Sequence, residues 1–118
     1  MALLAGHWTL KGFGHWVLED AASGALVGRA GLYFPEGWPG LEVGWTVPRS
    51  HWGRGYAPEA GAASMEWARN ELGATHLISL IADENLRSQP VAAKLGMSLE
   101  GRAQVRGHDV RLYWVDLG

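Results

Sequence analysis

A short stretch with two glycines, "HWGRGYAPEA" at residues 51–60, is the part of the chain best suited to hold an anion. It leads directly into a segment of helical character. The first turn of a helix offers amide groups without helical acceptors, at the positive end of the helix dipole. Gly53 and Gly55 let the backbone close around an anion without side chains in the way. From these residues alone, the amides from Gly53 to Ala57 form either a pyrophosphate cradle or a tight corner between a strand and a helix.

Other phosphate motifs and metal chemistry have no support in the sequence. The glycine spacing matches neither a P-loop nor a G-x-G-x-x-G fingerprint. The chain has no cysteine, which excludes disulfides, thiolate nucleophiles and cysteine-based zinc sites. Its five histidines show no H-E-x-x-H pattern and no close ligand spacing. We therefore expect no metal site.

The composition predicts one soluble, globular domain: 118 residues, of which 47% are hydrophobic and 19% charged. The net charge of −2, without any basic run, gives no indication of nucleic-acid binding. No apolar run approaches the length of a membrane span, and the opening "MALLAG" lacks the features of a signal peptide. We expect a cytoplasmic protein with no membrane or nucleic-acid partner.

Three strands and a helix are expected to position the glycine loop. Turn residues between apolar runs predict strands joined as an antiparallel meander, over residues 16–19, 25–34 and 41–47. A helix is predicted over residues 57–73, with Pro58 in its first turn and Gly73 at its end.

The second half of the chain continues with alternating strands and helices. The near-continuous apolar run at residues 75–82 predicts a strand that is buried on both faces. A short helix begins near Ser88 or Gln89, because Pro90 is tolerated only in a first turn. A hairpin is predicted over residues 102–117. The resulting order, β-β-β-α-β-α-β-β, predicts an α+β fold with a mixed sheet.

Three segments together resemble the GCN5-related N-acetyltransferases: the strand "LEVGWTV", the glycine loop that follows it, and "ENLRSQPVAAKLGM" further along. The similarity is closest to the subgroup that includes the ribosomal-protein N-terminal acetyltransferases. The W-G-x-G-Y-A form of residues 52–57 looks like this subgroup's variant of the family's pyrophosphate motif. The match runs from about Gly14 to the C-terminus. It implies a mixed, mostly antiparallel sheet with helices on its faces.

The resemblance implies acetyl-coenzyme A as a co-substrate. Its pantetheine arm would lie like an extra strand in a V-shaped gap between residues 41–47 and 75–82. The loop amides would hold the pyrophosphate, and Arg54 would either add a charge contact or point into solvent. A cofactor-binding role is thereby implied for Thr46, Val47, Trp52, Gly53, Arg54, Gly55, Tyr56, Ala57, Asn85 and Ser88.

The resemblance also gives two candidate catalytic residues, Glu42 and Ser88. Glu42 is either the base or amine-binding carboxylate that prepares the acceptor, or an ordinary carboxylate at the sheet rim. Ser88 would lie near the thioester sulfur and Asn85 would bond the cofactor arm, although helix capping also explains either residue. A backbone N–H at Val47 would polarise the thioester carbonyl. Many members of the family carry a tyrosine general acid at the position of Ala92.

Two functional hypotheses follow. The first is an N-acetyltransferase that transfers acetyl to a primary amine, either a protein N-terminus or a small amine, by direct attack. The second is a non-catalytic coenzyme A-binding or assembly module derived from an acetyltransferase, and a folded remnant without a ligand is a third alternative. The stretch "MALLAGHWTLKGFG" is too short for the strand and helix pair with which the family usually begins. We therefore expect a homodimer that covers the exposed apolar surface, while Trp38 and Trp45 either line the acceptor pocket or pack in the core.

Overall fold

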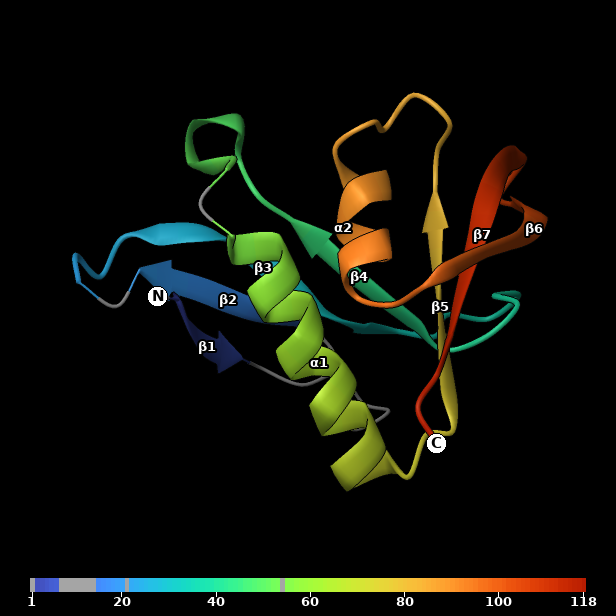
Figure 1. The fold of residues 1–118 in the computed structure, drawn as a ribbon, viewed down its shortest axis with the longest axis horizontal. Helices are drawn as coiled ribbons and strands as arrows, with labels where there is room; N and C mark the ends of the chain where they lie inside the picture. The colour runs from blue at the N-terminus through green and yellow to red at the C-terminus, as the bar shows by residue number, and fades with distance from the viewer. Residues whose placement is uncertain (1, 7–14, 21, 54) are drawn as a thin grey trace.

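The computed structural model describes residues 2–6, 15–20, 22–53 and 55–118, which fold into one mixed sheet with two α-helices (Figure 1). Along the chain the elements are β1 (Ala2–Gly6), β2 (His15–Asp20), β3 (Leu26–Tyr33), β4 (Glu42–Thr46), the 3₁₀ turn η1 (Arg49–His51), α1 (Tyr56–Leu72), β5 (His76–Ile81), α2 (Ser88–Lys94), β6 (Ser98–Val105) and β7 (His108–Asp116). Across the sheet the strand order is β1-β2-β3-β4-β5-β7-β6. Within the described part of the chain, only β4 and β5 are parallel neighbours. None of the described helices combines the length and the apolar character that crossing a membrane requires.

The predicted α+β fold with a mixed, mostly antiparallel sheet is confirmed, and so is the element order from β2 onward. One strand was not predicted: β1 pairs antiparallel with β2 at the edge of the sheet. Its five residues form a short apolar run, and such a run does not by itself distinguish a strand from other structure.

The C-terminal hairpin is longer than predicted and turns one residue earlier. β6 begins at Ser98 rather than at residue 102, and the first residues of this edge strand are exposed, so they show no apolar alternation. We expected the turn at Gly107 and His108, whereas it lies at Arg106 and Gly107, whose φ angles are 48° and 80°. Two successive positive φ angles suit the twist of a two-residue hairpin turn.

Both helices pack on the same side of the sheet (Figure 1). Ala68 of α1 and Ala92 of α2 are fully buried in the same cluster as Val43 of β4. Where the helices meet, a Cβ atom on Gly61 would lie 2.6 Å from Cδ1 of Leu95. Because glycine has no side chain, α2 and the loop before it can lie close to α1 at this position.

Glycines in the left-handed conformation define both ends of α1. Gly55 precedes the helix with a φ of 79°, and Gly73 follows it with a φ of 65°. The N–H of Gly73 donates to the carbonyl of Ala68 and so closes the last turn. The helix predicted over residues 57–73 is confirmed to within one residue, and α2 begins at Ser88, as predicted from Pro90.

Candidate active site

β4 and β5 diverge after a single bridged position. Glu42 of β4 pairs with Ile78 of β5, and no other pair bridges these two strands in the described part of the chain. Beyond this point β4 slants away from β5, as Figure 1 shows. Across the gap, the indole N–H of Trp45 donates to Oγ of Ser88 at 3.1 Å. The end of β4 and the start of α2 are therefore joined by a side-chain hydrogen bond across the gap.

A cavity of about 440 Å³ lies along this gap. Its walls come from the end of β4, the glycine loop, the first turn of α1 and the loop that enters α2. Every predicted cofactor-binding residue that the structure describes lines this cavity, namely Thr46, Val47, Trp52, Gly53, Gly55, Tyr56, Ala57, Asn85 and Ser88. Arg54 lies outside the described residues.

The glycine loop owes its shape to backbone conformation. Gly53 and Gly55 have φ angles of 81° and 79°, a region that other residues rarely adopt. A Cβ atom on either glycine would meet nothing within 4 Å, so the two positions face open space. At the start of α1, backbone amides such as that of Ala57 lie at the positive end of the helix dipole. The loop therefore combines an open cavity wall with a helix end suited to an anion.

The side chain of Tyr56 anchors this loop to the sheet. The ring is 5% exposed and packs with Leu18 and Val27, while its hydroxyl donates to the carboxylate of Asp20. This hydrogen bond, together with backbone N–H donors from residues 22 and 23, lowers the pKa of Asp20 to about 2. Because the ring points into the core, Tyr56 presents mainly its backbone to the cavity.

Cationic side chains border the cavity around Trp52. The Trp52 indole N–H donates to the Val47 carbonyl at 2.9 Å. The guanidinium carbons of Arg87 and Arg49 lie 4.4 Å and 5.5 Å from the centroid of the indole ring. Arg87 and Lys94 also line the cavity. The sequence did not single out these cations, because they are scattered along the chain, yet the fold places Arg87 and Lys94 in the cavity that the glycine loop also lines.

A second cavity, of about 400 Å³, contains Glu42. It shares four lining residues with the first cavity, and these are Trp45, Thr46, Asn85 and Ser88. The two cavities therefore meet at the gap between β4 and α2. Trp45 borders both spaces and also packs against the two core clusters, so both alternatives given for this residue still apply.

Glu42 is a buried carboxylate with two hydrogen-bond donors. The residue is 8% exposed, Oε2 accepts the Leu80 N–H at 2.7 Å, and Oε1 accepts the Trp38 indole N–H at 2.9 Å. Burial raises the pKa of Glu42 above its ordinary value, and the two donors partly offset this effect. Glu42 is therefore not a solvated carboxylate at the sheet rim, and Trp38 serves to hold it in place.

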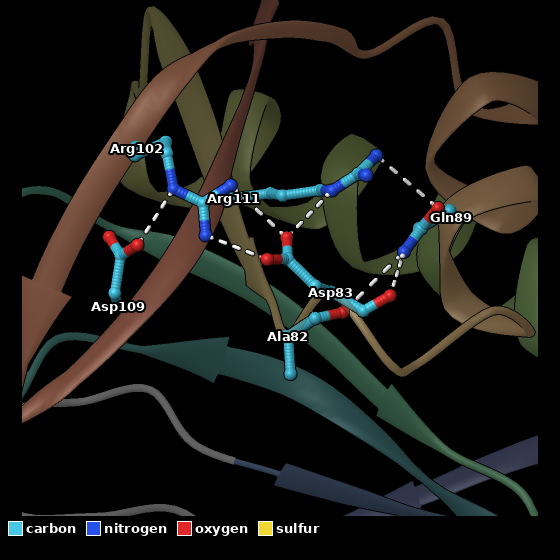
Figure 2. A network of polar contacts seen from close by, with 6 residues as sticks. All are labelled: Ala82, Asp83, Gln89, Arg102, Asp109 and Arg111. Carbon is cyan, nitrogen blue, oxygen red and sulfur yellow. Dashed lines mark hydrogen bonds and ion pairs between the residues drawn. The ribbon is translucent and has the colours of Figure 1, made fainter.

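A polar network fixes the loop that carries Asn85 and Ser88 (Figure 2). The carboxylate of Asp83, at the end of β5, accepts N–H groups from Arg102 at 3.1 and 2.9 Å and from Arg111 at 2.9 Å. Both guanidinium groups lower the pKa of Asp83 to about 2. The network thus ties the end of β5 to the β6–β7 hairpin.

The same network reaches the first turn of α2. The side-chain amide of Gln89 donates to the Asp83 carbonyl at 3.0 Å and accepts from Arg111 at 3.4 Å. Within the loop, Oδ1 of Asn85 accepts the N–H of Ser88 at 3.2 Å. Asn85 therefore makes a capping contact and also lines the cavity, so its predicted contact with the cofactor stays a proposal.

The site therefore consists of a diverging pair of parallel strands and, beside it, a cavity that reaches the first turn of α1. A family model described as an acetyltransferase (GNAT) domain matches residues 1–98. The chain belongs to this family of acetyltransferases.

Three similar proteins illustrate the family relationship. Uncharacterized protein YkkB of Bacillus subtilis (strain 168) is 36% identical over 91 residues, which are 74% of this chain and 53% of that protein. The acetyltransferase from Agrobacterium tumefaciens str. C58 superposes with a TM-score of 0.78 at 30% identity, covering 87% of this chain and 60% of the other. The ribosomal-protein-S5-alanine acetyltransferase from Vibrio fischeri shares the fold, with a TM-score of 0.75 at 19% identity over 88% and 61% of the two chains. The chain spans between half and two thirds of the length of these relatives.

Proposed function

We propose that this chain transfers the acetyl group of acetyl-coenzyme A to a primary amine, either a protein N-terminus or a small amine, by direct attack of the amine on the thioester. The observation that carries the proposal is the junction of the two cavities. One cavity offers an anion-suited helix start, the other contains a buried carboxylate, and Ser88 and Thr46 border both.

The first cavity fits a long thioester that carries phosphate groups. The glycine loop and the start of α1 supply backbone N–H donors, and Arg87 and Lys94 add positive charge. The backbone of β4 beyond its bridged position, at Thr46 and Val47, offers peptide groups to an extended arm. When bound, acetyl-coenzyme A would supply the activated acetyl group.

The second cavity suits the acceptor amine. Each carboxylate oxygen of Glu42 accepts one N–H in this structure, so lone-pair sites remain for an amine or a bridging water. Its raised pKa makes Glu42 a stronger proton acceptor than an ordinary carboxylate. An α-amine, with a pKa of about 8, needs less help to become neutral than a lysine amine at about 10.4. An α-amine is therefore the primary amine that this carboxylate would prepare most readily.

Ser88 is the candidate donor to the departing thiolate. Its Oγ already accepts the Trp45 indole N–H, so the hydroxyl proton stays available for donation toward the cavity. Ala92 is fully buried in the core and supplies no acid. A thiol with a pKa of about 8.5 is a fair leaving group, so a weak donor is sufficient.

A product assay tests this proposal. The protein is incubated with acetyl-coenzyme A and either a peptide with a free N-terminus, the same peptide with a blocked N-terminus and one lysine, or a polyamine. We expect thiol release together with acetylation of the free α-amine, detected by mass spectrometry. Glu42→Gln should lower kcat by about 10²-fold or more, as expected for the loss of a general base. Binding of acetyl-coenzyme A without any acetylated product would instead support a non-catalytic coenzyme A-binding module.

A further inference from the structure

The parallel ladder between β4 and β5 stops at Glu42. The Ile78 N–H donates to the Leu41 carbonyl at 3.0 Å, which is an ordinary contact between parallel strands. In such a ladder, the next amide of the same strand to face its neighbour lies two residues further, at Leu80. A continued ladder would bring this amide to the carbonyl of Val43. In this structure the Leu80 N–H donates to Oε2 of Glu42 instead, at 2.7 Å.

The Glu42 carboxylate, whose contact with Leu80 replaces the ladder, is held firmly in its position. The carboxylate is buried, and a hydrogen bond to an ionised group is shorter and stronger than one between neutral groups. The other oxygen is held by the indole N–H of Trp38 at 2.9 Å. The Trp38 ring in turn packs edge-on against Tyr33 at 6.1 Å between centroids and lies 5.0 Å from the guanidinium carbon of Arg106. The carboxylate is therefore held at both oxygens.

We propose that the Glu42 carboxylate is a wedge that keeps the gap between β4 and β5 open, because it takes up the Leu80 amide and ends the ladder after one bridge. The peptide groups of β4 beyond Gly44 are then left to a ligand. Without the carboxylate, Leu80 would pair with Val43 and draw the strands together. The identity of the ligand rests on the proposed function, whereas the separation of the strands does not.

Two substitutions at Glu42 distinguish its role as a wedge between the strands from its role as a general base. A glutamine at this position would keep an oxygen for the Leu80 amide but would not accept a proton, so Glu42→Gln should leave the Kd for acetyl-coenzyme A within about threefold while kcat falls. Glu42→Leu has a similar size and no acceptor, so its Kd should rise by about tenfold or more. Glu66→Leu makes the same replacement at an exposed position of α1 that lines neither cavity, and it is the matched control, with the Kd expected to stay unchanged.

The strands themselves are tested without any ligand. In isotope-labelled protein, Glu42→Leu should show new cross-strand NOEs between Gly44 and Leu80 that neither the wild type nor Glu42→Gln shows. A folded Glu42→Leu variant without these NOEs, or with a wild-type Kd, would overturn the proposal. If the wild type failed to bind acetyl-coenzyme A, the proposed function would be refuted. The NOEs would still show whether Glu42 keeps β4 and β5 apart.

A measurement on the wild type covers the case in which Glu42→Leu does not fold. The amide proton of Leu80 and the indole proton of Trp38 should shift with pH at the midpoint of the Glu42 carboxyl carbon signal. Arg29 and Tyr33 of β3 are ionisable side chains that line the same cavity, so the midpoint is assigned from the carbon signal of Glu42 itself. A Leu80 amide that does not follow this titration would overturn the proposal.

Discussion

Glu42→Gln should change how the stability of the protein depends on pH. Burial raises the pKa of Glu42 in the folded state above the value of 4.5 that is usual for a glutamate, so the folded state holds this proton more tightly than the unfolded chain. The wild type should therefore lose stability, relative to the variant, as pH rises from about 4.5 through the folded pKa. Each unit by which folding raises the pKa corresponds to about 1.4 kcal/mol.

The variant also loses part of its free energy of unfolding by an amount that does not depend on pH. Its glutamine would present one acceptor oxygen, which the Leu80 N–H would take, so the Trp38 N–H would face the amide NH₂ group. A buried donor without an acceptor costs about 1–3 kcal/mol. We expect Glu42→Gln to be less stable than the wild type by about this amount near pH 4.5, with the difference shrinking as pH rises through the folded-state pKa of Glu42.

Urea denaturation between about pH 4.5 and pH 8, followed by tryptophan fluorescence, measures both effects. Glu66→Gln, on an exposed position of α1, is the control for removing a carboxylate. Titrations common to the wild type and the variant cancel in the difference. A stability difference that stays constant or widens with rising pH would refute the description of Glu42 as a carboxylate whose burial raises its pKa.

Three further predictions concern the groups around the cavity. Asp83→Asn should weaken acetyl-coenzyme A binding, measured by calorimetry, because its two arginine partners then lose the negative charge that they share and one of the two acceptor oxygens. In the wild type, Asp83 contributes stability that is fully present above pH 3.8 and is lost as pH falls toward 2, so acid denaturation of Asp83→Asn should lack this component. Tyr56→Phe should raise the pKa of Asp20 from about 2 toward its ordinary value, which a carboxyl NMR titration would show. Trp45→Phe should lower kcat by about three- to tenfold in the product assay, because Ser88 loses the donor that orients its hydroxyl.

The glycine loop and the helix that follows it could be predicted because their residues follow one another along the chain. Positive φ angles at Gly53 and Gly55, and a helix that starts next to Pro58, depend on local preferences that the sequence displays directly. The same holds for Gly73 at the end of α1. These local signals placed α1, and with it the glycine loop, within one residue of the observed position.

The contacts that shape the rest of the site depend on residues far apart in the sequence. Asp83 meets its arginine partners 19 and 28 residues further along the chain, and Glu42 meets Leu80 across 38 residues. No local pattern indicates such pairs, because they form only when the sheet is assembled. The exposed start of β6 was missed for a related reason, since an edge strand without a buried face shows no alternation. The expected homodimer and cytoplasmic location stay predictions.

The central claim is that the glycine loop holds the phosphate groups of acetyl-coenzyme A, and a calorimetric titration of the wild type beside two glycine variants tests it most directly. Gly55→Glu places a carboxylate in the cavity wall, while Gly73→Glu imposes the same kind of backbone strain at the far end of α1, with open space at both positions. We expect the wild type and Gly73→Glu to bind acetyl-coenzyme A and Gly55→Glu to lose binding. Absence of binding by the folded wild type, or equal binding by Gly55→Glu, would contradict the claim and leave the loop as a corner between a strand and a helix.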